Sequence, residues 1–121
     1  MIDDITTKIM QNVFITGTNL LAFNTTIKRV DLDIAERNLR ESGPDWLRTQ
    51  TPGITLLQGD LNDEIVYGVV NGDVRLRAFL DIFGKGIVSA MVIPAKGGFS
   101  FVKYRPLIDS PIIGLPEIKE L

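Results

Sequence analysis

The chain has 121 residues, a formal net charge of −2 and 45% hydrophobic residues, so it can form one domain with a buried core and has no general attraction to nucleic acid or anionic membranes. It contains no cysteine and no histidine, which excludes disulfides, thiolate metal sites, cysteine nucleophiles and the commonest general base. Because no catalytic or cofactor motif stands out either, the sequence predicts no catalytic residue, no cofactor and no metal ligand.

The first third of the chain has the apolar spacing of a helix. Most intervals are three or four residues, which places on one helix face Ile2, Ile5, Ile9, Val13, Leu20, Phe23, Ile27, Val30 and Ile34. Gly17 interrupts the segment, so residues 1–50 predict one long kinked helix or two shorter ones. An extended conformation of residues 13–34 is the alternative, because Val13–Thr16 is rich in strand-forming residues and aspartates alternate with apolar residues further on.

Glycine and proline mark the end of this helix. The Ser-Gly-Pro sequence at 42–44 predicts the stop, since glycine suits the C-cap and proline cannot continue the helix. A helix that starts afresh is the alternative, because residues 33–36 fit a capping box. Beyond the stop, residues 44–47 predict one helical turn that buries Trp46, and residues 51–53 predict a loop.

Three glycine-containing turns predict an antiparallel meander over residues 54–105. Asn-Gly at 71–72, between alternating apolar residues, is the preferred two-residue hairpin signal. Gly-Lys-Gly at 84–86 predicts a three-residue hairpin loop, and residues 95–98 predict a looser one. A first strand at 54–57 and a turn at 59–62 give a sheet of about five strands. The pairs expected from these turns are Val69 with Val74, Ile82 with Val88, and Val92 with Phe101.

The expected pairing divides the side chains between two sheet faces. One face is almost wholly apolar and is expected to be the core. The second face is mixed, and it is too apolar for exposure to solvent alone. We therefore predict an interface made by this second face and the C-terminal tail, with the residues Val66, Val70, Arg75, Arg77, Phe79, Phe83, Met91, Ile93, Tyr104, Ile112 and Ile113.

Residues 106–121 predict an extended tail. Prolines at 106, 111 and 116 remove backbone donors and fix φ, which rules out a helix interior or a central strand. The leucines and isoleucines between them are too numerous for a disordered polar tail. We expect the tail either to cover the core edge of its own domain or to dock on a neighbouring chain.

Two further clusters have the residue types of binding sites. Oxygen ligands for a hard cation gather at residues 60–64, but without the spacing of a calcium loop, so we expect a solvated turn. Cations and aromatic rings, which bind single-stranded nucleic acid in other proteins, are split by the expected register. On one face lie Arg75, Arg77 and Phe79, and on the other Lys103, Arg105, Phe99 and Phe101. The sequence therefore predicts no binding to nucleic acid.

These features predict a single α+β domain over residues 1–121, in which the N-terminal helix packs on an antiparallel meander followed by an extended tail. The helical part covers residues 1–50, the sheet residues 54–105 and the tail residues 106–121. Residues 1–4 lack the basic start of a signal peptide and no apolar run is long enough to span a membrane, so we expect a cytoplasmic protein without membrane contact.

The leading hypothesis for function is a non-enzymatic interaction or assembly protein, whose partner is a second copy or another protein. One alternative is a small-ligand protein, or an enzyme that needs neither histidine nor cysteine, with a pocket between helix and sheet near Trp46, Tyr67 and Arg77. Another alternative is an acidic inhibitor, or an immunity-like partner, of a basic protein, which the pI of 5.0 allows.

Overall fold

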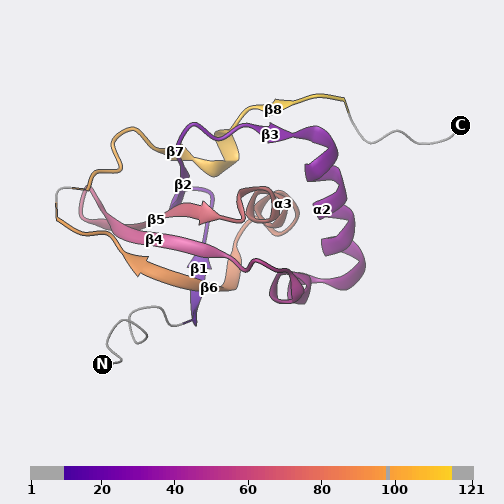
Figure 1. The fold of residues 1–121 in the computed structure, drawn as a ribbon, viewed down its shortest axis with the longest axis horizontal. Helices are drawn as coiled ribbons and strands as arrows, with labels where there is room; N and C mark the ends of the chain where they lie inside the picture. Colours follow the sequence, from indigo (N-terminus) through magenta and orange to yellow (C-terminus); the bar gives the residue numbers. More distant parts are fainter. Residues whose placement is uncertain (1–9, 98, 116–121) are drawn as a thin grey trace, which may run out of the picture.

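The central sheet is mixed rather than purely antiparallel (Figure 1). The computed structural model describes residues 10–97 and 99–115. Strands follow one another in the order β1-β6-β4-β5-β2-β7. Their bounds are β1 Met10–Ile15, β2 Leu20–Ala22, β4 Thr55–Leu61, β5 Glu64–Asn71, β6 Gly86–Pro94 and β7 Arg105–Pro106. A separate parallel pair joins β3 (Ile27–Lys28) to β8 (Ile112–Ile113).

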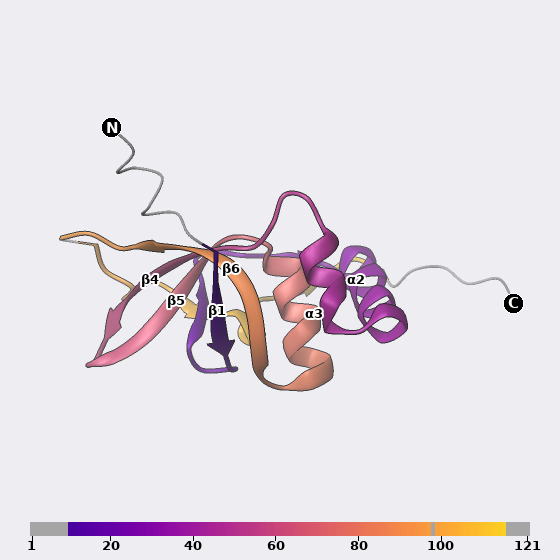
Figure 2. The ribbon, with the colours of Figure 1, turned by 90° about the horizontal axis from the view of Figure 1, so that it is seen from below.

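Two helices stack on one side of this sheet (Figure 2). Helix α3 (Asp73–Phe83) lies against the sheet, and α2 (Arg29–Ser42) packs on the outer side of α3. Two short 3-10 helices complete the fold, η1 (Pro44–Thr49) and η2 (Leu107–Asp109). The predicted α+β class is therefore confirmed. The main core lies between helices and sheet, and its fully buried large side chains are Ile15, Leu20, Ile27, Leu32, Leu39, Ile54, Leu56, Leu76 and Leu107.

Residues 10–28 form three short strands joined by turns, so the helix predicted for the first third is wrong there, while residues 1–9 lie outside the described residues. β1 pairs antiparallel with β6, and β2 pairs in parallel with β5. Along β1 the side chains alternate, with Val13 and Ile15 buried and Phe14 exposed. Val13, Leu20 and Ile27, which contributed to the helical spacing, thus lie in three different strands, and pairing with other strands decided their conformation.

Helix α2 begins at Arg29 and ends where the sequence predicts. Gly43 has a φ of 77° and donates its backbone N–H to the carbonyl of Leu39 at 2.8 Å, which confirms the predicted stop. The capping box predicted at 33–36 is not the start, because Lys28 occupies the N-cap position. One face of the helix is buried at intervals of three and four, through Leu32, Ala35 and Leu39.

Residues 44–71 form the predicted helical turn and then one hairpin. In η1, Leu47 is buried and Trp46 is partly buried against the main core. β4 and β5 pair antiparallel, and the hairpin turns at Asn62 and Asp63, whose φ values of 54° and 67° are those of a two-residue primed turn. The turn predicted at 59–62 is therefore placed too early, since β4 continues to Leu61.

Residues 73–83 form α3, so the hairpins predicted at the Asn-Gly and Gly-Lys-Gly motifs are wrong. Gly72 has a φ of 107° and occupies the N-cap position of α3. Gly84 has a φ of 81° and donates its N–H to the carbonyl of Leu80 at 2.8 Å, which ends the helix. Both glycines supply a positive φ, but they begin and end a helix instead of joining two strands. The residues expected opposite Val69 and Val88 consequently lie on α3.

Residues 99–104 cover part of the sheet face opposite the helices, and they do not form the strand expected opposite Val92. Phe101 is 2% exposed, and its ring lies over Gly59 of β4 and Gly68 of β5. A Cβ on Gly68 would lie 2.9 Å from the Cε1 atom of that ring, so both glycines are needed for the close approach. This second, smaller core also contains Leu21, Leu57, Leu61, Val66 and Tyr104.

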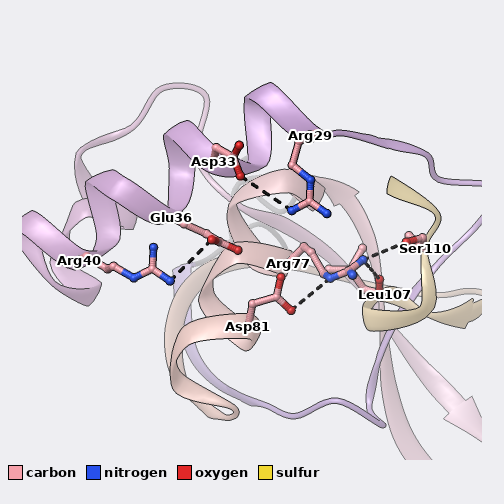
Figure 3. Close-up of polar contacts among 8 residues, drawn as sticks. All are labelled: Arg29, Asp33, Glu36, Arg40, Arg77, Asp81, Leu107 and Ser110. Atoms are coloured by element: carbon pink, nitrogen blue, oxygen red, sulfur yellow. Dashed lines mark hydrogen bonds and ion pairs between the residues drawn. The ribbon is translucent and has the colours of Figure 1, made fainter. Parts of the chain in front are cut away.

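The described part of the tail belongs to its own domain. Leu107 is fully buried in the main core, and β8 continues beside β3. Arg77 of α3 is buried and donates from Nη1 to the carbonyl oxygens of Leu107 at 3.3 Å and Ser110 at 3.0 Å (Figure 3). Its Nε donates to Oδ1 of Asp81 at 3.2 Å. Of the two expectations for the tail, coverage of its own core therefore holds for residues 106–115.

Replacement of Arg77 tests this link between α3 and the tail. Arg77→Met leaves two carbonyl groups without their donor, so we expect the free energy of unfolding to fall by about 2–4 kcal/mol. Urea denaturation provides the measurement. Arg40→Met, which removes a guanidinium whose side chain is 64% exposed, is the matched control with an expected change below about 0.5 kcal/mol. Equal losses in both variants would contradict the role given to Arg77.

A second prediction tests the packing of Phe101 on Gly59 and Gly68. A methyl group on Gly59 collides with the ring of Phe101, so Gly59→Ala should lower the free energy of unfolding by about 1–3 kcal/mol through overpacking. Gly97→Ala is the control, since a Cβ there meets no atom within 4 Å. Thermal unfolding of the two variants checks the difference, and an unchanged melting temperature for Gly59→Ala would show that Phe101 does not pack as described.

Candidate functional site

The sheet face opposite the helices has a covered half and an open half. The register joins Leu57 of β4 to Gly68 of β5 on one side and to Ile93 of β6 on the other, so these residues share a row. Over β5 and β2 the face is covered by residues 99–104. Over β1 and β6 it is exposed, and we name the residues Met10, Phe14, Ile87, Met91 and Ile93 the open face.

Large apolar side chains line the open face in cross-strand pairs. Met10 lies opposite Met91, and Phe14 lies opposite Ile87, with Asn12 and Ser89 between them. Phe14 is 51% exposed and Ile87 is 64% exposed. The alternate residues of both strands point to the main core, so these side chains cannot turn inward without a change of register. Contiguous exposed apolar side chains of this kind mark interaction sites in soluble proteins.

β1 is also an edge strand. It ends the sheet, and within residues 10–97 and 99–115 no strand pairs with its outer side. Its sequence, Met-Gln-Asn-Val-Phe-Ile, contains no charged residue and no proline, the residues that commonly block edge pairing. The opposite edge strand, β7, has only two residues. The free hydrogen-bonding edge of the sheet and its open apolar face therefore meet at β1.

The predicted interface residues are divided among several elements. On the sheet face opposite the helices lie Val66, Val70, Met91 and Ile93, and Tyr104 packs over Gly68 from the loop. The other predicted residues do not share this face: Arg75, Arg77, Phe79 and Phe83 lie on α3, and Ile112 and Ile113 lie on β8. The prediction that all these residues share one sheet face is therefore wrong for the six residues of α3 and β8. For α3, the prediction applied the alternation of a β-strand to residues that form a helix.

The buried members of that set have structural roles. Phe79 is 3% exposed in the main core and contacts the ring of Phe83 at a centroid distance of 4.9 Å. Val66 is buried in the smaller core beneath Phe101. Arg75 lies in the first turn of α3, where burial lowers its pKa against the opposing effect of Asp73, and its Nη1 has no hydrogen-bond partner among the described residues.

Three residues of the open face were missed by the sequence prediction. Met10 and Phe14 fall in the segment predicted as helix, and Ile87 falls beside a hairpin loop that does not exist. A signal was present in the alternative conformation, because an extended stretch from Val13 to Thr16 puts Phe14 on the side opposite its neighbours. Nothing in the sequence placed β1 beside β6, since that pairing joins residues more than seventy positions apart.

A second group of charged side chains lies between α2 and α3 (Figure 3). Arg29 pairs with Asp33 at 3.8 Å, and Arg40 pairs with Glu36 at 3.7 Å, both along α2. The carboxyl group of Glu36 lies near that of Asp81 on the neighbouring helix. Burial and the charge of Asp81 raise the pKa of Glu36 above its ordinary value, while Arg40 lowers it. This cluster lies between two helices.

The acidic turn at residues 60–64 is exposed at the tip of the β4–β5 hairpin. Asn62 and Asp63 form the turn itself, and their positive φ values explain their presence there. In the part of the chain that the structure describes, no three acidic, histidine or cysteine side chains are grouped to hold a metal ion. The residues proposed for a helix–sheet pocket are used elsewhere: Trp46 and Tyr67 pack on the core and Arg77 holds the tail.

The raised pKa of Glu36 makes a testable contribution to stability. A carboxyl group whose pKa is raised by folding binds its proton more tightly in the folded state, so stability rises as the pH falls through that pKa and is lost as the pH rises. Ionised Glu36 therefore destabilises the fold at neutral pH. Glu36→Gln should raise the melting temperature at pH 7, and the gain should shrink as the pH approaches the ordinary value of 4.5.

Calorimetric scans at several pH values measure this effect. Glu41→Gln, which removes a negative charge from an exposed position of the same helix, controls for the change in net charge. A gain for Glu36→Gln that grows on acidification has the wrong sign and would contradict a raised pKa of Glu36.

The chain matches no protein-family model, no curated protein and no solved structure. Within residues 10–97 and 99–115, no helix has the length and apolar character needed to cross a membrane. A function for this chain therefore has to be argued from the chemistry of its own surfaces.

Proposed function

We propose that the protein is a non-enzymatic assembly protein that self-associates through the outer edge of β1 and the open face beside it. The observation that carries the proposal is an uncharged edge strand with two large exposed apolar side chains, Met10 and Phe14. Unpaired backbone donors and acceptors along such an edge bind another strand readily. The sequence predicts self-association through a mixed sheet face and the tail, and two of the predicted interface residues, Met91 and Ile93, lie on β6 beside this edge strand.

A second copy is the partner that fits this edge best. Two β1 strands that pair antiparallel about Asn12 place Met10 of one copy opposite Phe14 of the other, and the same contact repeats on the far side of the two-fold axis. A thioether beside an aromatic ring is a favourable contact, and each cross-strand pair of this kind contributes about 0.2–1 kcal/mol. No like charges meet across the join, because β1 carries none.

The open face gives this association its second component. Ile87 and Met91 lie one strand further in, opposite Phe14 and Met10. Edge pairing joins the open faces of two copies into one wider apolar surface with Asn12 at its centre. The tail has no part in the proposal, because Leu107 and Ile112 pack on the core of their own domain.

The oligomeric state of charged variants tests the proposal. We expect light scattering coupled to size-exclusion chromatography to show a dimer for the unaltered chain and a monomer for Phe14→Glu. A carboxylate placed in the strand join should weaken dimerisation at least about a hundredfold, since a buried unpaired charge costs several kcal/mol. Phe14 is half exposed, so the monomer should stay folded, with an unfolding free energy within about 1 kcal/mol of the unaltered chain.

Val102→Glu is the matched control. Val102 is 75% exposed and lies in the loop at residues 99–104, away from β1, so its replacement should leave the dimer intact. A monomeric unaltered chain at its highest soluble concentration, or a dimer that Phe14→Glu does not weaken, would show that β1 is not the contact.

A further inference from the structure

A polar cleft lies beside β7, at the other edge of the sheet. It has a volume of about 440 Å³ and is bounded by the loop after β2, the residues around β7 and the end of η2. Lys103 and Arg105 bring two positive charges to it, and Asp109 brings one negative charge. Neither side chain forms an ion pair with any described residue. The ammonium group of Lys103 and the guanidinium group of Arg105 are therefore available to a ligand.

The walls of the cleft are held by backbone contacts. Ala22 pairs with Arg105 where β2 meets β7. The backbone N–H of Ile27 donates to the carbonyl of Pro111 at 2.9 Å, which closes the loop after β2 against the tail. Arg77 holds the carbonyl of Ser110 from the core side. Three residues with hydroxyl groups, Thr25, Thr26 and Ser110, therefore line the cleft from segments that are bonded to one another.

An aromatic groove adjoins this cleft. It has a volume of about 360 Å³ and is lined mainly by Phe23, Phe99, Val102 and Tyr104. The rings of Phe23 and Tyr104 lie 5.4 Å apart at an interplanar angle of 43°. Lys103 lines both hollows, and Phe23 in the groove is followed directly by Asn24 in the cleft. One small molecule with a polar end and a flat apolar end can therefore occupy both.

We propose that the cleft and groove bind a nucleoside monophosphate, with its phosphate against Lys103 and Arg105 and its base on the rings of Phe23 and Tyr104. Two cations and three hydroxyl groups suit an anion with several oxygen atoms. The carboxylate of Asp109 is an acceptor for the hydroxyl groups of a sugar, which gives the negative residue of the cleft a role. The combined hollow has the size usual for small-molecule sites.

A single strand of nucleic acid is the competing ligand with the same chemistry. Proteins that bind single strands extend a positive groove along several nucleotides. Here the hollow offers two cations, and the chain as a whole carries a net charge of −2. Two cations within one hollow suit the single phosphate group of a mononucleotide better than a chain of phosphates, so the observations favour the small ligand.

Binding of adenosine 5′-monophosphate to the full chain, measured by isothermal titration calorimetry and by amide shifts in NMR spectra, tests the proposal. We expect saturable binding with shifts confined to residues 22–26 and 99–111. Adenosine and inorganic phosphate should each bind at least about tenfold more weakly, since each lacks one of the two contacts. Phe23→Ala and Lys103→Ala should also weaken binding at least about tenfold, while Lys85→Ala, which removes an exposed lysine after α3, should not.

Three outcomes would overturn the proposal. One is the absence of saturable shifts with adenosine 5′-monophosphate. Another is inorganic phosphate that binds as tightly as the nucleotide with no effect of Phe23→Ala, which leaves an anion site only. The third is affinity for oligoadenylates that rises steadily with length and falls steeply with salt, which indicates a nucleic-acid site. The monomeric Phe14→Glu variant should bind the nucleotide unchanged, so this test and the test of self-association fail independently.

Discussion

One buried guanidinium, that of Arg77, bonds helix α3 to the described part of the tail. Arg77 is charged and buried, a costly arrangement that persists only because its N–H groups have partners: the carbonyls of Leu107 and Ser110 and the carboxylate of Asp81. These bonds fix η2 against α3. With η2 in place, β8 can pair with β3, and the polar cleft acquires its third wall. The sequence predicts Arg77 to be an interface residue. In the structure the N–H groups of its planar guanidinium bind partners inside the protein instead.

On the sheet face opposite the helices, the presence or absence of glycine decides where a side chain from another segment can cover the sheet. On neighbouring strands β4 and β5 the sheet has two glycines, Gly59 and Gly68, and a single ring, Phe101, fills the space that they leave. On the same face of β1 and β6 no glycine leaves space for an aromatic ring. The side chains of Phe14 and Ile87 are exposed there. Exposure on this half is thus a direct consequence of side-chain volume, and nothing else in residues 10–97 and 99–115 covers it.

Features that depend on residues close together in the sequence were predicted correctly more often than features that depend on distant residues. Local signals held: Gly43 ends α2, and η1 begins at Pro44. The hairpin assignments failed because a positive φ at glycine suits a helix cap as well as a tight turn. Apolar positions within residues 73–83 also recur at three and four, and that pattern predicts α3, but alternation from the neighbouring strand outweighed it.

Long-range pairing was beyond the sequence, and both candidate sites depend on it. The open face exists because β1 pairs with β6, and the cleft exists because β2 brings β7 beside the loop after it. The two places lie at opposite edges of one sheet. The proposed association through β1 would leave the cleft uncovered, so such a dimer would present two separate clefts. Coupling between them would need an element with two arrangements, and the strands between the edges are fixed by a packed core on the helix side and by Phe101 on the other. The architecture therefore favours ligand binding that is independent of assembly.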